Sequence, residues 1–333
     1  MLQYLIILLD DTSTSYCQCD NNNHVKNLIS IENLKAGIFY GMKENLMIQF
    51  VYPDYPLPQE YKDMINTIDH NDIVSSRCED ISLIRNADVV VFHDWKAILD
   101  AVLDEMKIYT LRTAKDALFD RYKFLGDIIQ KTKRLNIVIN DIDKFTSSDF
   151  DKYDTMLQYL STIVKDGYAQ GMSPNLNLLT DRMMLEKMNN CNAGVENITL
   201  APDGNFYVCP AFYYVGLCDG KEKSLGEECQ KGYFVGALSE GLDLKNPQLY
   251  QLRHAPLCRN CDAYQCKRCV WLNRKTTLEI NTPSHEQCVV AHLERNASKR
   301  LLEDIQALGT FLPNQEIKEI DYLDPFDIRT RFK

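Results

Sequence analysis

The sequence predicts an α/β protein with a larger N-terminal part built on a parallel sheet and a smaller, cysteine-rich C-terminal part. As far as residue 179, short apolar runs that suit buried strands alternate with segments of helical periodicity. Such alternation is typical of parallel sheets. Beyond that point the cysteines gather, four of them in the twelve residues CRNCDAYQCKRC at 258–269. A length of 333 residues allows two structural parts of unequal size.

Six segments have the character of buried strands. The first, YLIILL at 4–9, ends at a polar Asp-Asp-Thr-Ser stretch. The others are expected at residues 46–52, 88–92, 108–111, 136–140 and 175–179. Between them, a helix that Ser30 can cap carries Ile31, Leu34 and Ile38 at helical spacing. Further helices are expected at 59–68, at 98–106, after a capping box formed by Thr113 and Asp116, and at 148–169. The pattern alone leaves open an open doubly wound sheet or a partial barrel.

The C-terminal cysteines follow a regular order. Cys191 opens the run CNAGVENITLAPDGNFYVC, in which Asp203-Gly204 predicts a two-residue β-hairpin turn that returns Cys209 towards Cys191. Apolar residues recur at helical spacing after Cys288 and predict a closing helix. Thiolates at C-x2-C spacing place two sulfurs within reach of one metal, as in zinc ribbons and iron–sulfur proteins. The candidate metal ligands are Cys191, Cys209, Cys258, Cys261, Cys266, Cys269 and Cys288.

Composition excludes several classes of function. Proteins that bind nucleic acid generally carry a basic face, whereas this chain has a formal net charge of −10, so we expect no nucleic-acid partner. The opening MLQYLIILLDD has no basic region and only a brief apolar run, which predicts a buried strand rather than a signal peptide or membrane span. We therefore expect a cytoplasmic protein that does not bind membranes. In that compartment twelve cysteines favour metal or redox chemistry over disulfides.

The order of these cysteines resembles the SPASM domain, the auxiliary-cluster module of many radical SAM peptide-modifying enzymes. Between the later cysteines the family pattern has five and three residues, and this chain has four and two. The resemblance implies two 4Fe–4S clusters, one held by Cys258, Cys261, Cys266 and Cys288. The other would be held by Cys191, Cys209 and Cys269.

Two questions about these clusters stay open. The fourth position of the second cluster is open to substrate or is filled by Cys218 or Cys229, which are otherwise thiols in a loop. Zinc is an alternative to iron at all these cysteines, because tetrahedral thiolate sites accept either metal.

The same resemblance implies that the N-terminal half is a radical SAM-like partial (β/α)6 barrel. The expected domains are the barrel at residues 1–190, a SPASM-like domain with a β-hairpin at 191–296, and a C-terminal helix and tail at 297–333. The radical SAM motif CxxxCxxC is degenerate here, because the loop after the first strand, DDTSTSYCQCDNNNHV, carries only Cys17 and Cys19. His24 is a third ligand or a surface residue. YPDYPLP replaces the family's glycine-rich turn after the second strand, so we do not expect S-adenosylmethionine to bind.

The segments ILLDDTSTSYC and ENLMIQFVYPDYPLPQEY, combined with the SPASM-like end, resemble the CXXX repeat peptide maturase family. The resemblance implies an iron–sulfur protein that matures a ribosomally made peptide with repeated cysteines, alongside a radical SAM enzyme. If it is catalytic, the protein modifies that peptide. The alternatives are a non-catalytic scaffold that binds peptide or a radical SAM enzyme, and a structural protein stapled by zinc. His93, followed by Asp94, lies at a strand end where α/β proteins keep active sites, but a structural hydrogen bond is the interpretation that we favour.

Overall fold

The computed structural model describes residues 2–188, 191–217, 234–309 and 314–317. Contacts divide the chain into two units, Met1–His93 with Asn192–Gln251, and Asp94–Cys191 with Leu252–Lys333. We describe each unit by itself. The contact-based grouping does not test the expected domains 1–190, 191–296 and 297–333, which stay a prediction.

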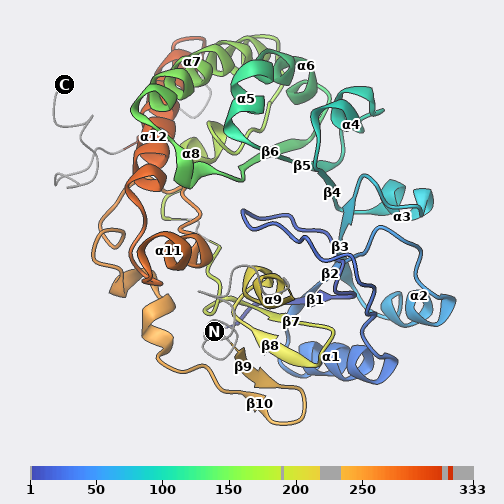
Figure 1. The fold of residues 1–333 in the computed structure, drawn as a ribbon. Helices are drawn as coiled ribbons and strands as arrows, with labels where there is room; N and C mark the ends of the chain where they lie inside the picture. Colours follow the sequence, from blue (N-terminus) through green and yellow to red (C-terminus); the bar gives the residue numbers. More distant parts are fainter. Residues whose placement is uncertain (1, 189–190, 218–233, 310–313, 318–333) are drawn as a thin grey trace. The chain divides into compact units, whose positions relative to one another are not determined.

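The first unit is built on a mixed sheet (Figure 1), with the strand order β10-β9-β8-β7-β1-β2-β3-β4. Strands β1 to β4 run parallel, β7 joins the other side of β1 in parallel, and β8, β9 and β10 extend that edge in antiparallel fashion. The strands are β1 (Tyr4–Leu8), β2 (Met47–Val51), β3 (His70–Ser75), β4 (Val89–Phe92), β7 (Asn197–Leu200), β8 (Asn205–Tyr207), β9 (Phe234–Ala237) and β10 (Gly241–Leu242). The helical elements of this unit are α1 (Ile31–Lys43), α2 (Gln59–Ile65), α3 (Ile81–Asn86), α9 (Pro210–Leu217) and η3 (Pro247–Tyr250).

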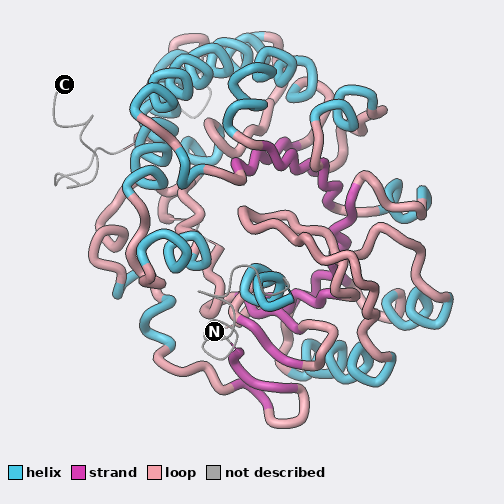
Figure 2. The backbone as a smooth tube through the Cα atoms, in the orientation of Figure 1, coloured by secondary structure: helices cyan, strands magenta, loops and turns pink. Residues whose placement is uncertain are grey.

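Helix α1 shows how the sequence produces this packing. The Ser30 hydroxyl accepts a hydrogen bond from the Asn33 N–H, as its capping position predicts. The buried face of α1 includes Leu34 and Ile38, and it also carries Gly41, where a side chain would run into Ile48 of β2. The helix therefore lies close against β1 and β2, where Figure 2 shows it as a cyan coil beside magenta strands.

The hairpin β7–β8 forms as expected, but its turn is longer than the two residues that we predicted. The Gly204 N–H donates to the Ala201 carbonyl at 3.0 Å, and Gly204 has a φ of +79° whereas Asp203 does not have a positive φ. Pro202 fixes a negative φ at the first position of a three-residue loop, and the predicted two-residue turn, which needs a positive φ at both Asp203 and Gly204, does not form.

Gly236 in β9 provides a test of the antiparallel extension. It has a φ of +125°, and a Cβ there would meet the backbone of Gly241 and lie 2.9 Å from the Leu242 Cα. We expect Gly236→Ala to lower the free energy of unfolding in urea by about 2 kcal/mol. Gly241 has a φ of +83° with no atom within 4 Å of the corresponding Cβ. Gly241→Ala is therefore the matched control, with a loss of about 1 kcal/mol. Equal losses in the two variants would contradict this account.

The second unit combines a parallel strand pair with a group of helices. Strands β5 (Ile108–Thr113) and β6 (Arg134–Ile139) pair along their whole lengths. The helices are α4 (Trp95–Asp100), α5 (Lys115–Arg121), α6 (Leu125–Ile129), α7 (Ser147–Ala169), α8 (Thr180–Met184), α11 (Val270–Thr277) and α12 (His285–Gln306), with the 3-10 turns η1 (Tyr122–Phe124), η2 (Ile142–Lys144) and η4 (Leu252–His254). The two long helices, α7 and α12, lie side by side (Figure 1). In the described part of the chain, no helix combines the length and apolar character needed to span a bilayer.

Some expected elements differ from those observed. The helix expected at 98–106 forms only over 98–100, as the end of α4, which starts at Trp95 because the Asp94 carboxylate accepts the Ala97 N–H at 2.7 Å. The expected capping box does not form, since Thr113 belongs to β5 and its hydroxyl accepts the Trp95 indole N–H at 2.9 Å. Strand β3 was not predicted.

The last expected strand, at 175–179, is also not a regular strand. It makes one bridge, between Leu176 and Leu135 of β6, and then turns into α8. The Thr180 hydroxyl accepts the Leu176 N–H at 3.0 Å, which ends the extended conformation.

Candidate metal centre

The cysteine-rich segment at 258–269, in the second unit, is shaped by two tight turns. The Cys261 N–H donates to the Cys258 carbonyl at 3.1 Å, and the Cys266 N–H donates to the Ala263 carbonyl at 3.0 Å. The segment ends at Cys269, which is the N-cap of α11. The first C-x2-C pair is therefore held on a turn, the local geometry that brings two thiols towards one centre, and the second turn leads into the Cys266–Cys269 pair.

Backbone N–H groups point at three of the predicted ligand sulfurs. The Cys261 Sγ accepts from the Ala263 N–H at 3.4 Å, and the Cys266 Sγ accepts from the Arg268 N–H at 3.4 Å. The Cys269 Sγ accepts from the Leu272 N–H at 3.5 Å. Hydrogen bonds of this kind favour the thiolate over the thiol, and in iron–sulfur proteins they tune the cluster. The donors present here thus fit the chemistry of a metal-bound thiolate.

The surroundings of the first thiols are apolar. Cys258 is buried with Met188 and Ala255, and Tyr264 packs against this group. Burial, together with the nearby Cys258 thiol, raises the pKa of the Cys266 thiol to about 12. Near neutral pH this thiol is protonated in the metal-free chain, so that metal binding there would release a proton.

Two buried arginines fix the position of Asp262, the residue after Cys261. The Arg295 guanidinium of α12 donates to the Asp262 carboxylate at 2.8 Å, and both side chains are buried. The Arg182 Nε–H of α8 donates to the Asp262 carbonyl at 2.6 Å, and its guanidinium lies 4.3 Å from the centre of the Tyr264 ring. The turn between the two cysteine pairs is therefore tied to both helices.

Helix α12 makes a second set of buried contacts with the segment. The Gln265 amide donates to the Ala291 carbonyl at 2.6 Å and to the Glu294 carboxylate at 3.2 Å. The Tyr153 hydroxyl of α7 donates to the other Glu294 oxygen at 2.6 Å. Burial raises the pKa of Glu294 from 4.5 to about 7, although these two hydrogen bonds act in the opposite direction.

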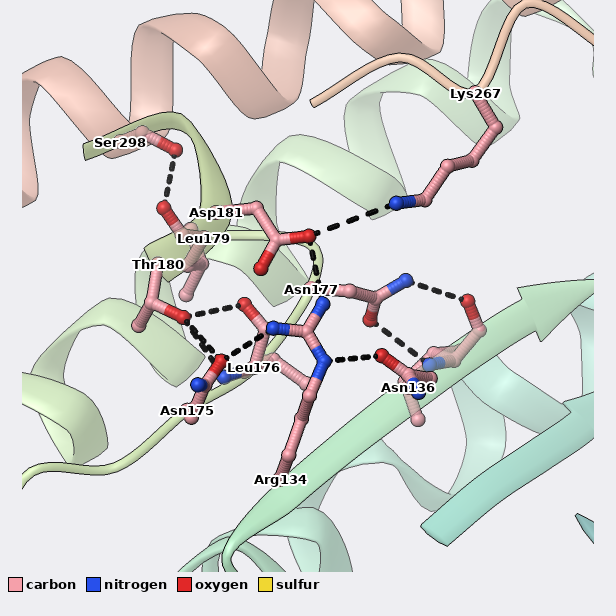
Figure 3. Close-up of polar contacts among 11 residues, drawn as sticks. Arg134, Asn136, Asn175, Leu176, Asn177, Leu179, Thr180, Asp181, Lys267 and Ser298 are labelled. Carbon is pink, nitrogen blue, oxygen red and sulfur yellow. Dashed lines mark hydrogen bonds and ion pairs between the residues drawn. The ribbon is translucent and has the colours of Figure 1, made fainter. Parts of the chain in front are cut away.

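A polar network links the strand pair to the same segment (Figure 3). Asp181 of α8 accepts a hydrogen bond from Arg134 of β6 at 2.7 Å, and the Lys267 ammonium lies 3.8 Å from the same oxygen. The Asn177 amide completes the edge of β6, since it accepts from the Ile137 N–H at 2.8 Å and donates to the Ile137 carbonyl at 3.0 Å. Lys267, which lies between Cys266 and Cys269, is thus connected to the sheet.

The other predicted ligands are placed as follows. The Cys191 N–H donates to the Lys267 carbonyl at 3.0 Å, which brings Cys191 to the cysteine segment. Cys288 lies in the first turn of α12, where its N–H donates to the Ser284 carbonyl at 3.2 Å. Cys209 belongs to the first unit, whereas the other six predicted ligands belong to the second. Cys218 and Cys229, the alternative fourth ligands, lie outside the described residues.

In this segment, side chains that could bind a metal come close to one another in pairs. The Cys261 Sγ lies 3.4 Å from the His292 Nε2 of α12. Among the residues that the structure describes, no three or more His, Cys, Asp or Glu side chains are arranged to hold one metal ion. The ligand set of seven cysteines therefore stays a prediction, supported by the N–H donors and by the turns.

A second group of thiols lies in the loop after β1, in the first unit. The Cys17 and Cys19 sulfurs are 3.7 Å apart, whereas His24 is an exposed residue farther along the loop. His93, at the end of β4, lies 2.8 Å from the Thr14 hydroxyl through its Nε2. The ten described cysteines of the chain are present as thiols rather than disulfides.

The buried polar residues that surround the cysteine segment were not predicted from the sequence. One signal was available for Glu294. It lies one helical turn after Val290 and one before Ser298, on a face of α12 that is buried and otherwise without charge at these positions. A carboxylate within such a stripe calls for a partner, because an isolated buried charge is costly. No comparable local signal marks Arg182 or Asp262.

Comparison with known proteins gives structural matches only. No family model matches the chain, and no curated protein matches it. Native anSMEcpe with bound AdoMet and the Cp18Cys peptide has a TM-score of 0.59 and 11% identity, covering 92% of this chain and 100% of that chain. The same protein with AdoMet and the Kp18Cys peptide has a TM-score of 0.58 and 11% identity, covering 91% and 99%. Native anSMEcpe with AdoMet alone has a TM-score of 0.55 and 12% identity, covering 92% and 100%.

At this level of identity the likeness concerns the fold. The mixed α/β character expected from the alternating strands and helices is confirmed, and the likeness to the radical SAM fold is one of fold alone. The chain has a radical SAM-like α/β fold.

Proposed function

We propose that this chain is an iron–sulfur protein that takes part in the modification of a peptide. Its cysteines at 191, 209, 258, 261, 266, 269 and 288 would bind the clusters. The observation that carries the proposal is the set of backbone N–H groups directed at the sulfurs of Cys261, Cys266 and Cys269. Iron–sulfur clusters bound there would supply electron transfer or an iron that binds a substrate thiolate.

The structural neighbours support the peptide part of the proposal. Two of the anSMEcpe structures are described as holding a peptide together with AdoMet. The resemblance to maturases of CXXX repeat peptides narrows the proposed substrate to a ribosomal peptide with repeated cysteines. A soft thiolate is a preferred donor for an iron with an open position, so a substrate cysteine suits a cluster with three protein ligands.

The structural neighbours do not support our expectation about S-adenosylmethionine. They are described with bound AdoMet, whereas we expected this chain not to bind it. The loop after β1 carries two cysteines one residue apart, Cys17 and Cys19, instead of three. We therefore propose that a separate radical SAM enzyme starts the chemistry. Reduced protein incubated with S-adenosylmethionine should release no 5′-deoxyadenosine above a no-protein control, and release at enzymatic turnover would sink this part of the proposal.

The substrate proposal is tested with two synthetic peptides that differ only in having cysteine or serine at every fourth position. We expect the cysteine peptide to shift the electron paramagnetic resonance signal of the anaerobically prepared, reduced protein, and the serine peptide to leave it unchanged. The variant Cys78→Ser should respond to the two peptides as the wild type does, because Cys78 is a buried thiol outside the proposed ligand set. An equal response to both peptides, or tight binding of both with no change in the signal, would rule out thiolate binding at a cluster.

A further inference from the structure

The loop between β1 and α1 holds two thiols side by side. The Cys17 Sγ lies 3.7 Å from the Cys19 Sγ, and the Ser15 hydroxyl oxygen is 3.9 Å from the first and 4.0 Å from the second. The chain bends at residues 17–19. A bend keeps the Cα atoms of residues two apart within the range that a disulfide can bridge, so only a small movement of the sulfurs would join them.

Hydrogen bonds hold the loop that carries Cys17 and Cys19 in a defined conformation. The Asp10 carboxylate accepts the Thr12 N–H at 2.8 Å and the Tyr55 hydroxyl at 2.7 Å. The Asn21 amide donates to two carbonyls of the loop, those of Asp11 and Ser13, both at 2.9 Å. These contacts fix the loop before the bend and return the chain after it.

Three further contacts hold the bend and the loop that leads to it. The Ser15 hydroxyl donates to the Cys19 carbonyl at 2.5 Å, which closes the five residues that include both thiols. The Tyr213 hydroxyl of α9 donates to the Asp11 carboxylate, and the Thr14 N–H donates to the Tyr52 carbonyl at 3.0 Å. The distance between the sulfurs is therefore set by the fold of the first unit.

The two thiols differ in accessibility. Cys17 is half-buried, whereas Cys19 is only 1% exposed. An attacking thiol has to reach its substrate, while a resolving thiol has only to reach the attacking one. The arrangement gives Cys17 the first role and Cys19 the second.

We infer that Cys17 and Cys19 form a redox-active dithiol that reduces a disulfide substrate. The Cys17 thiolate attacks one sulfur of the substrate disulfide, whose S–S bond breaks and whose other sulfur leaves as a thiolate. The Cys19 thiolate then attacks the Cys17 sulfur and releases the second substrate thiolate. The two electrons of the pair end on the substrate, and the two thiol protons end on its sulfurs. The products are two substrate thiols and a Cys17–Cys19 disulfide.

A small-molecule or cellular dithiol would restore the pair. A disulfide that closes so short a loop is strained, and strained disulfides are the easily reduced, exchangeable ones. The same reaction reduces a disulfide in a peptide or in a small molecule such as glutathione disulfide, and the test has one arm for each. The inference does not depend on the metal centre, because it uses neither the seven proposed ligands nor a cluster.

The test uses the full chain, prepared anaerobically with its metal content intact and freed of reductant. It is mixed with excess glutathione disulfide in one arm and with a peptide containing one intramolecular disulfide in the other. Thiols are then alkylated and the protein is digested with trypsin. Cleavage at Lys26, the first lysine or arginine of the sequence, releases a fragment whose cysteines are Cys17 and Cys19, so that the pair is assayed apart from the other ten.

Wild-type protein should yield this fragment with an internal disulfide in the arm that contains its substrate. Cys19→Ser should instead accumulate a mixed disulfide at Cys17, with release of the second substrate thiol at least about tenfold slower, because an intramolecular step is lost. In the peptide arm that mixed disulfide still holds the peptide. Cys17→Ser should give neither product. Cys78→Ser, which removes a buried thiol of the same unit, should behave as the wild type.

Three results would overturn the inference. The first is a wild-type fragment that is alkylated at both cysteines after exposure to both disulfides. The second is an equal amount of mixed disulfide in wild type and in Cys19→Ser, which would show that Cys19 does not resolve it. The third is a loss of iron from the double variant Cys17→Ser/Cys19→Ser, which would assign the thiols to a metal. A failure of the metal-centre proposal would change iron content without changing thiol exchange, so the two proposals fail separately.

Discussion

Replacing Arg295 by methionine should lower the free energy of unfolding by about 3–5 kcal/mol, because it leaves the Asp262 carboxylate buried without its charge partner. Arg295 and Asp262 have side chains that are 8% and 7% exposed, and their closest atoms are 2.8 Å apart. Methionine keeps much of the apolar stem, so lost packing contributes less to the change. The free energy is measured by urea denaturation, followed by circular dichroism.

The matched control lies on the same helix. Arg300 contacts Asp154 at 3.2 Å, with side chains that are 45% and 30% exposed. Solvent screens such a pair, so Arg300→Met should cost less than about 1 kcal/mol. Adding Asp262→Asn to Arg295→Met should recover part of the loss, because the buried charge is then removed. A loss of similar size in both single variants would show that the Asp262 contact does not hold the cysteine segment against α12.

Glu294 alone should lower the free energy of unfolding by about 3 kcal/mol as the pH rises from 4.5 to 7. Burial raises the pKa of Glu294 from 4.5 to about 7, so the unfolded chain loses this proton at lower pH than the folded chain. In that window the folded state binds more protons, and its free energy of unfolding therefore decreases as the pH rises. Above about pH 7 both states are ionised and the contribution is constant.

Comparison of wild type with Glu294→Gln isolates this group. Other carboxyls act in the opposite direction, such as Asp149, whose pKa is lowered to about 2 by Lys115 and the Thr146 cap against the effect of its own burial. They titrate alike in both proteins and cancel in the difference. The stability of Glu294→Gln relative to wild type should thus rise between pH 4.5 and pH 7. A difference that stays level with pH would mean that Glu294 is ionised in the folded state throughout.

Local sequence signals predicted the elements that local physics determines. Helix α1 begins where Ser30 caps it, and the apolar run after Gln3 forms β1, whose residues Leu5, Ile7 and Leu8 are wholly buried. Strand β3 escaped prediction because it opens with His70, Asn71 and Asp72, which are polar residues typical of turns. Its parallel partners β2 and β4 supply hydrogen bonds on both sides, and this tertiary effect outweighs the local preference.

Part of the candidate site could likewise be predicted from the sequence. The spacing of the cysteines indicates thiol pairs on turns, and the structure has one turn across the Cys258–Cys261 pair and another that leads into Cys266. The residues that position these turns, such as Arg182 and Tyr153, lie 80 and 141 residues from their partners along the chain. Contacts of that range depend on the packing of α7, α8 and α12, which no local pattern specifies.

The central claim is that the cysteines of the second unit, with Cys209, bind iron–sulfur clusters, and chemical analysis of iron, acid-labile sulfide and zinc in anaerobically purified protein tests it most directly. Two 4Fe–4S clusters correspond to about eight irons and about eight sulfides per chain. Cys266→Ser should lose about half of both, whereas Cys78→Ser should keep the wild-type content. Two zinc ions with no sulfide would contradict the claim.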